Sequence, residues 1–158
     1  MTPKLVLPEN ISNALLGFAS PPIEVEKGCF LVGVVENKDV RVDYLANKRA
    51  GSASHVDIGD AAEVTVLLED AGLFCIKYIV GWAHTHPWTD GHLFISGTDV
   101  NAQRELQKSQ PCAVALVVSS DGMNAYKTVD KRGTNKYYEI DCLKAPNTGH
   151  EVYLEDLL

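Results

Sequence analysis

The spacing of apolar residues along the chain separates helix-like segments from strand-like ones. Where apolar side chains recur at intervals of three and four residues, the pattern is that of a helix with one buried face. Polar residues that can cap a first turn, and a glycine or proline near the far end, support the same boundaries. The pattern predicts helices over residues 9–19, 60–71 and 98–109.

Runs of β-branched and aromatic residues, bounded by turn signals, predict the strands. The polar residues 36–39 predict a hairpin turn, and Asp121-Gly122 predicts a second one. Loops are expected over residues 46–58 and 87–95. The strands are predicted over residues 30–35, 40–45, 76–82, 113–118, 123–129 and 137–140. This order of elements predicts a mixed α/β (α+β) domain over residues 1–145, with one central sheet flanked by helices, and a tail over residues 146–158.

The composition of the chain excludes some kinds of binding partner. The chain has 158 residues and a formal net charge of -7, which argues against nucleic acid or an anionic membrane as a partner. There is no signal pattern at the N-terminus, and no apolar run approaches the roughly 18 residues of a membrane helix. None of the four cysteines forms a C-x-x-C pair, and Cys29, Cys75 and Cys112 lie in apolar runs. We therefore expect a cytoplasmic protein with buried, reduced thiols.

The residues with the clearest chemistry lie where the strand over 76–82 ends. His84 and His86 are two positions apart, so an extended chain directs both imidazoles to one face. Asp99 falls in the first turn of the next predicted helix, where a carboxylate also suits the helix dipole. Two imidazoles and a carboxylate are the three protein ligands of many catalytic zinc sites, which leave a fourth position for water. The sequence therefore predicts a metal site at His84, His86 and Asp99.

The same segment resembles the JAMM motif of the MPN-domain metalloproteases, H-x-H-P followed after a spacer by S-x-x-D. The matching residues are His84-Thr85-His86-Pro87 and Ser96-Gly97-Thr98-Asp99. The flanks, residues 80–83 and 99–103, are similar to those of the proteasome-lid and signalosome deubiquitinases. Glu26 lies seven residues before Gly33, which is the spacing of the family's upstream glutamate. The spacer between Pro87 and Ser96 is longer than is usual in the family.

The resemblance implies a fold, a cofactor and a reaction. The fold would be a single MPN domain, a curved central mixed sheet flanked by helices. His84, His86 and Asp99 would bind one zinc ion, Glu26 would be the general acid and base, and Ser96 would help to stabilise the oxyanion. The reaction would be hydrolysis of the bond between lysine and the C-terminus of ubiquitin or a ubiquitin-like protein. The partners would be such conjugates, and subunits of a proteasome-type or other complex.

Several alternatives stay open at the level of sequence. Trp88 and His92 lie in the spacer and are candidates for substrate contact, although exposed loop residues of these types are common. Glu24 competes with Glu26, because both would face the same side of an extended chain. The same ligands would suit a hydrolase of sulfur-carrier proteins or peptides, and two histidines with one carboxylate also suit Fe(II) in an oxygenase. A non-catalytic MPN scaffold subunit is the alternative outside enzymes.

Overall fold

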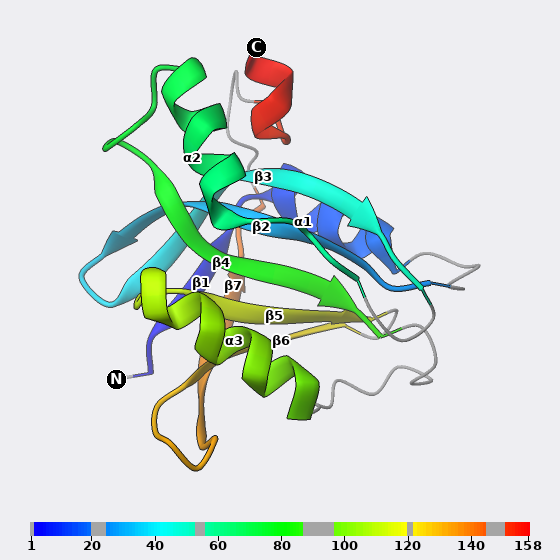
Figure 1. Cartoon of the computed structure of the whole chain (residues 1–158), viewed down its shortest axis with the longest axis vertical. Coiled ribbons are helices and arrows are strands. Elements are labelled where there is room, and N and C mark those ends of the chain that lie inside the picture. The colour runs from blue at the N-terminus through cyan, green and yellow to red at the C-terminus, as the bar shows by residue number, and fades with distance from the viewer. Residues whose placement is uncertain (1, 20–24, 53–55, 87–96, 120–121, 145–150) are drawn as a thin grey trace.

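The computed structural model describes residues 2–19, 25–52, 56–86, 97–119, 122–144 and 151–158. Within them, three α-helices and a short 3₁₀ helix accompany seven strands (Figure 1). The helices are α1 (Glu9–Phe18), α2 (Ala61–Asp70), α3 (Gly97–Ser109) and the 3₁₀ helix η1 (Leu154–Leu157). The strands are β1 (Lys4–Leu7), β2 (Lys27–Glu36), β3 (Asp39–Ala50), β4 (Tyr78–Thr85), β5 (Val114–Ser119), β6 (Gly122–Thr128) and β7 (Asn135–Cys142).

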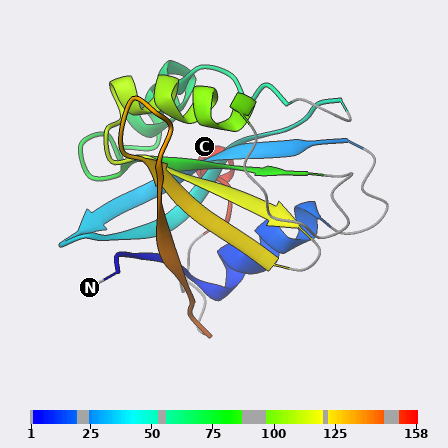
Figure 2. The same ribbon diagram turned by 90° about the horizontal axis from the view of Figure 1, so that it is seen from below.

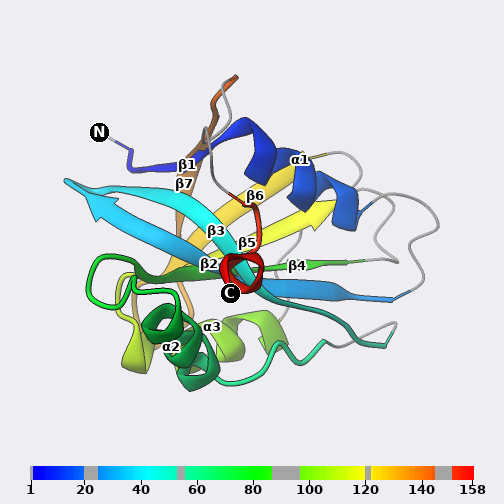
Figure 3. The ribbon, with the colours of Figure 1, turned by 90° about the horizontal axis from the view of Figure 1, so that it is seen from above.

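The strands form one closed barrel in the order β1-β3-β2-β4-β5-β6-β7. Most neighbours are antiparallel, but β4 pairs with β5 in parallel. The closing strand is β1, which pairs in parallel with β3 on one side and with β7 on the other. In Figure 3, β1 and β7 lie side by side close to the N-terminus, far along the chain from each other.

The predicted fold class is therefore wrong. The expected MPN architecture was an α/β domain with a curved central sheet flanked by helices, whereas the strands close into a barrel made mostly of sheet. The prediction failed because it contained no strand before residue 9. β1 has only four residues, between Pro3 and Pro8, so its periodicity carries no signal. Without this strand the sheet has two open edges; with it, both edges are paired.

The central strands β2, β4 and β5 are covered on both faces, which explains why their sequences are apolar runs with little alternation. One apolar cluster joins Leu5, Leu31 and Leu116 to the buried face of α1. The other joins Phe30, Trp82 and Val117 to α2 and α3. Figure 2 shows α1 on one side of the strands, with α2 and α3 together on the other. The second cluster supports the candidate site described below.

Most of the other predicted elements are confirmed. The helices end within about two residues of their predicted limits, as is usual for such boundaries. The first hairpin turns at Asn37, whose φ of 57° lies in the left-handed region that asparagine tolerates. Residues 46–50 belong to β3 although a loop was predicted there. Among the described residues, no helix combines the length and the apolar character needed to cross a membrane.

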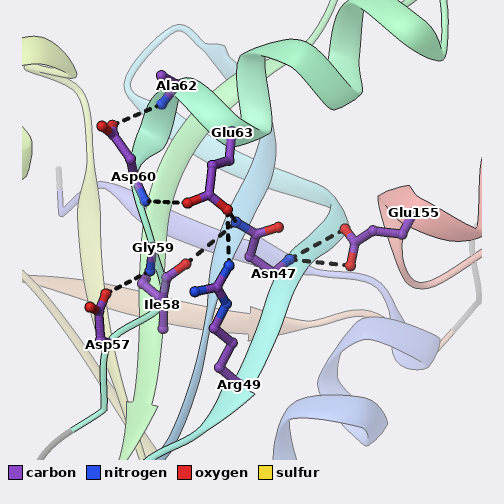
Figure 4. A network of polar contacts seen from close by, with 9 residues as sticks. All are labelled: Asn47, Arg49, Asp57, Ile58, Gly59, Asp60, Ala62, Glu63 and Glu155. Carbon is purple, nitrogen blue, oxygen red and sulfur yellow. Dashed lines mark hydrogen bonds and ion pairs between the residues drawn. The ribbon is translucent and has the colours of Figure 1, made fainter.

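A polar network fixes the end of β3 to α2 and to the C-terminal segment (Figure 4). The Asn47 amide donates to Glu63 Oε2 at 3.2 Å, and its backbone N–H donates to the carboxylate of Glu155 at 3.3 Å. Glu63 also pairs with Arg49 and accepts from the backbone of Asp60, completing a capping box at the start of α2. The loop before α2 is thereby held in place, and this loop lines one wall of a groove near the candidate site.

Candidate metal centre

The end of β4 and the start of α3 lie at the same side of the molecule (Figure 1). Trp82 and His84 on β4, and His86 directly after it, follow at intervals of two, so their side chains share the face that α3 covers. Asp99 is the third residue of α3. The sequence prediction that a strand end and a helix start bring these three residues together is confirmed.

The three ligand atoms converge closely. His84 Nε2 and His86 Nε2 are 2.9 Å apart. His84 Nε2 lies 3.1 Å from Asp99 Oδ1, and His86 Nε2 lies 3.0 Å from Asp99 Oδ2. All three residues are buried, with exposed fractions of 1%, 8% and 7% respectively. Two imidazole nitrogens and a carboxylate face one point at which a positive charge would be stabilised.

These distances suit a bound cation. In a tetrahedral zinc site with bonds of about 2.0–2.2 Å, neighbouring ligand atoms lie roughly 3.3 Å apart. The observed separations of 2.9–3.1 Å are shorter by only a few tenths of an ångström. The lone pairs of two neutral imidazoles repel each other at such a distance, unless a proton or a metal ion lies between them. The group of His84, His86 and Asp99 could therefore hold a metal ion.

Trp82 and Gln103 pack around the ligands. The indole of Trp82 stacks on the imidazole of His84, with ring centroids 4.4 Å apart and planes inclined by 11°. Gln103 lies one turn after Asp99 on the same face of α3 and accepts a hydrogen bond from the Trp82 indole at 2.7 Å. Sequence reasoning gave neither Trp82 nor Gln103 a role at the site. The spacing of Gln103 from Asp99 was the available signal, because an interval of four places both side chains on one face.

Tyr126, on β6, is a further buried group near the site that sequence reasoning missed. Burial raises the pKa of its phenol, and the negative charge of Asp99 raises this pKa further. The phenol therefore stays neutral at physiological pH. Its hydroxyl has no hydrogen-bond partner among the residues that the structure describes.

Glu26 lies at the same end of the barrel as the metal ligands. Its backbone exchanges hydrogen bonds of 2.7 Å with Gly51 and Ser52, just after β3. The next residue, Lys27, donates its backbone N–H to Thr85 Oγ1 at 2.9 Å. Gly28 pairs with His84 in the antiparallel β2–β4 ladder, so Glu26, two residues before Gly28, lies close to the end of β4. Backbone hydrogen bonds thus hold the half-buried Glu26 close to the end of β4.

Three further candidate residues from the sequence are Ser96, Trp88 and His92. All three lie between residues 87 and 96, outside the residues that the structure describes. Their predicted roles stay predictions.

A groove with a volume of about 540 Å³ runs along the wall next to the site, between α3 and the loop that leads into α2. Its apolar lining includes Phe30, Ile58 and Trp82, the residue that stacks on His84. Acidic side chains from both walls also line it: Asp57 and Asp60 from the loop, and Glu105 from α3. The groove therefore combines an apolar lining with negative charge, and Trp82 is the residue that it shares with the surroundings of His84.

Comparison with known proteins bears on the fold alone. No protein-family model and no curated protein matches the chain. A solution structure of a protein from Desulfitobacterium hafniense is similar to it, with a TM-score of 0.58 and 16% sequence identity. The alignment covers 93% of this chain and 98% of that protein. At this level of identity the likeness shows a shared fold, so the function has to be argued from the site.

Proposed function

We propose that this protein is a cytoplasmic, zinc-dependent peptidase that hydrolyses the bond between lysine and the C-terminus of ubiquitin or a ubiquitin-like protein. One zinc ion per chain is held by His84, His86 and Asp99, and Glu26 is the general acid and base. The observation that carries the proposal is the convergence of three buried ligand atoms within 4.8 Å of one another, in an H-x-H and S-x-x-D arrangement. A set of three protein ligands leaves a position for water, as in catalytic zinc sites.

The proposed chemistry assigns a separate task to each part of the site. A bound zinc ion would supply a Lewis acid and would lower the pKa of a water molecule towards neutrality. Glu26 accepts the proton of the attacking water and delivers it to the leaving lysine amine. Its position beside the end of β4 supports this role, because proton transfer requires a carboxylate within reach of both groups. Ser96 is proposed to donate a hydrogen bond to the developing oxyanion.

The lining of the groove beside the metal centre favours a polypeptide as the substrate. An extended segment that carries apolar and basic side chains would match its apolar lining and the acidic groups Asp57, Asp60 and Glu105. Such a segment would approach the metal centre past Trp82, with the scissile bond at the end of the groove. The flexible tail of a ubiquitin-like modifier has the required extended form.

The test is an assay of a panel of ubiquitin and ubiquitin-like conjugates, with linear C-terminal extensions alongside, in zinc and in a zinc chelator. We expect isopeptide cleavage that the chelator abolishes and that zinc restores. Elemental analysis of the purified protein should find about one zinc per chain, whereas iron would favour an oxygenase. Cleavage of linear extensions alone would favour a processing hydrolase.

Glu26→Gln is the decisive variant for the mechanism. It removes the proton acceptor and leaves the metal ligands intact, so we expect zinc binding to be kept and turnover to fall by about 10²–10⁴-fold. Glu24→Gln is the matched control, since Glu24 is the competing glutamate in the sequence. We expect it to retain activity. Full activity in Glu26→Gln would refute the assigned role.

A further inference from the structure

Gln103 is fully buried, yet both ends of its side-chain amide are hydrogen-bonded. Its Nε2 donates to the backbone carbonyl of Ala113 at 2.7 Å, directly before β5. Its Oε1 accepts from Trp82 Nε1 on β4 at 2.7 Å. A single side chain of α3 is thus tied to two neighbouring strands, one of which carries the histidines.

Trp82 connects Gln103 to His84, one of the proposed metal ligands. Its indole N–H is held by Gln103, which fixes the rotation of the ring about its side-chain bonds. The same ring lies flat against His84, at 4.4 Å between centroids and 11° between planes. The chain of contacts therefore runs from Ala113 through Gln103 and Trp82 to the His84 imidazole.

The His84 ring has to be oriented by its neighbours, because its second ring nitrogen, Nδ1, has no hydrogen-bond partner among the described residues. The torsion that turns an imidazole is intrinsically broad, so a ligand ring has to be oriented by its surroundings. A metal-binding histidine is usually oriented by a hydrogen bond from its second ring nitrogen to a carboxylate, a carbonyl or water. Among the residues that the structure describes, no hydrogen-bond partner exists for the buried Nδ1 of His84. Besides the edge contact with the His86 ring, stacking on Trp82 is the ring contact that holds the plane of the His84 imidazole.

We propose that Gln103 and Trp82 are positioning residues that orient His84 towards Asp99. The inference rests on the proposed metal site and adds to it the means by which the ligand geometry is set. Gln103 is well placed for this task, because it lies one helical turn from Asp99 and bonds to the strand of His84. The pair therefore fixes the two elements that contribute ligands, as well as the ring of one ligand.

Three single variants and one double variant test the proposal. Trp82→Phe keeps an aromatic ring but removes the N–H, Gln103→Met removes its acceptor, and Trp82→Leu removes both the ring and the N–H. Zinc affinity is measured by competition with a chromophoric chelator, and ligand geometry by the visible absorption of the Co(II)-loaded protein. We expect affinity about 10-fold lower in Trp82→Phe and Gln103→Met, with a larger loss in Trp82→Leu and a changed cobalt spectrum in all three.

The double variant Trp82→Phe/Gln103→Met should bind zinc about as weakly as Gln103→Met alone, because Gln103→Met already removes the Trp82–Gln103 hydrogen bond. Multiplicative losses would overturn the idea that they act as one unit. If Gln103→Met does not fold, Trp82→Phe alone carries the test, since it leaves the Gln103–Ala113 hydrogen bond in place.

Gln107→Met is the matched control. Gln107 follows Gln103 by one turn of α3 and also bridges helix to strand, donating to Thr128 O at 2.9 Å and accepting from Thr128 N at 3.1 Å. Its hydrogen bonds dock α3 on β6 through Thr128 and not through Trp82, so its loss should lower stability and leave zinc affinity and the cobalt spectrum unchanged. An equal loss of affinity in this control would overturn the inference, since general docking of α3 would then explain the effect.

The outcomes for the two proposals are distinguishable. Wild-type protein that binds neither zinc nor cobalt contradicts the metal site itself, and the positioning role falls with it. Wild-type protein that binds zinc, together with unchanged affinity and spectra in Trp82→Leu and Gln103→Met, overturns the positioning role and leaves the metal site standing.

Discussion

Replacing Gly81 with alanine should force β4 away from β5. Gly81 pairs with Val114 in the parallel ladder, and a Cβ at this position would lie 2.0 Å from the Val114 carbonyl oxygen. The closest ordinary C···O contacts are about 3.3 Å, so the strands would have to separate by roughly 1.3 Å at this point. The obstacle is backbone, which cannot turn aside as a flexible side chain would.

The expected loss of stability follows from this displacement. Overpacking of a buried site costs about 1–3 kcal/mol, and each ladder hydrogen bond that is stretched or lost adds about 1 kcal/mol. We therefore expect Gly81→Ala to lower the free energy of unfolding by about 2–4 kcal/mol. The same ladder continues to His84, which pairs with Val117. Because metal sites need their ligands within about 0.5 Å of the productive geometry, zinc affinity should fall as well, by about 10-fold or more.

Urea unfolding and zinc competition on the same preparations measure both effects. Gly17→Ala is the control: Gly17 lies in α1, and an added Cβ meets nothing within 4 Å. Alanine should stabilise the helix there by about 0.5–1 kcal/mol and leave zinc binding unchanged. Wild-type stability and zinc affinity in Gly81→Ala would refute the close approach of β4 and β5 on which this reasoning depends.

Four further predictions follow from the site and the core. Zinc at 100 times its dissociation constant should stabilise the fold by about 2.7 kcal/mol, which raises Tm by roughly 5–11 °C in a domain of this size, and scanning calorimetry should show no such rise for His84→Ala. Burial raises the pKa of the Cys29 thiol well above its ordinary value of 9.0, so the folded protein keeps a proton that the unfolded chain loses. Stability should then be unaffected below pH 9 and fall above it by up to about 1.4 kcal/mol per pH unit, as urea titrations across this range can check. A thiol reagent should modify the exposed Cys75 in the folded state and Cys29 only after unfolding; simultaneous labelling would contradict the assigned burial. Tyr126→Phe should leave zinc affinity unchanged and stability equal or higher by about 1 kcal/mol, because the lost hydroxyl has no partner among the described residues; a loss of stability in urea would contradict this.

The cysteines show that an apolar run in the sequence does not by itself predict burial. Cys29, Cys75 and Cys112 all lie in apolar runs, yet only Cys29 is buried, whereas Cys112 is half-buried and Cys75 exposed. Cys75 lies in the turn between α2 and β4, where its φ of 69° is in the left-handed region. Its neighbours Phe74 and Ile76 are exposed as well. An apolar run therefore indicates burial only when it forms a strand or helix that packs against the rest of the domain.

The sequence by itself determined the local elements and the residues of the candidate metal site. Helix periodicity, capping residues and turn signals act over a few residues, so α1, α2, α3 and the first hairpin were predictable. The ligand set was predictable for the same reason: His84 and His86 share a face by strand alternation, and Asp99 begins the next helix.

Only the tertiary structure decided the closure of the sheet and the surroundings of the ligands. β1 closes the barrel by pairing with β3 and β7, and its four residues have no pattern of their own that would reveal it. Gln103 and Tyr126 come to the site from separate elements, and the groove beside Trp82 is lined by residues of several elements. Strand pairing and side-chain packing are contacts between residues far apart in the chain, and their energies depend on a geometry that exists only once the whole domain has folded.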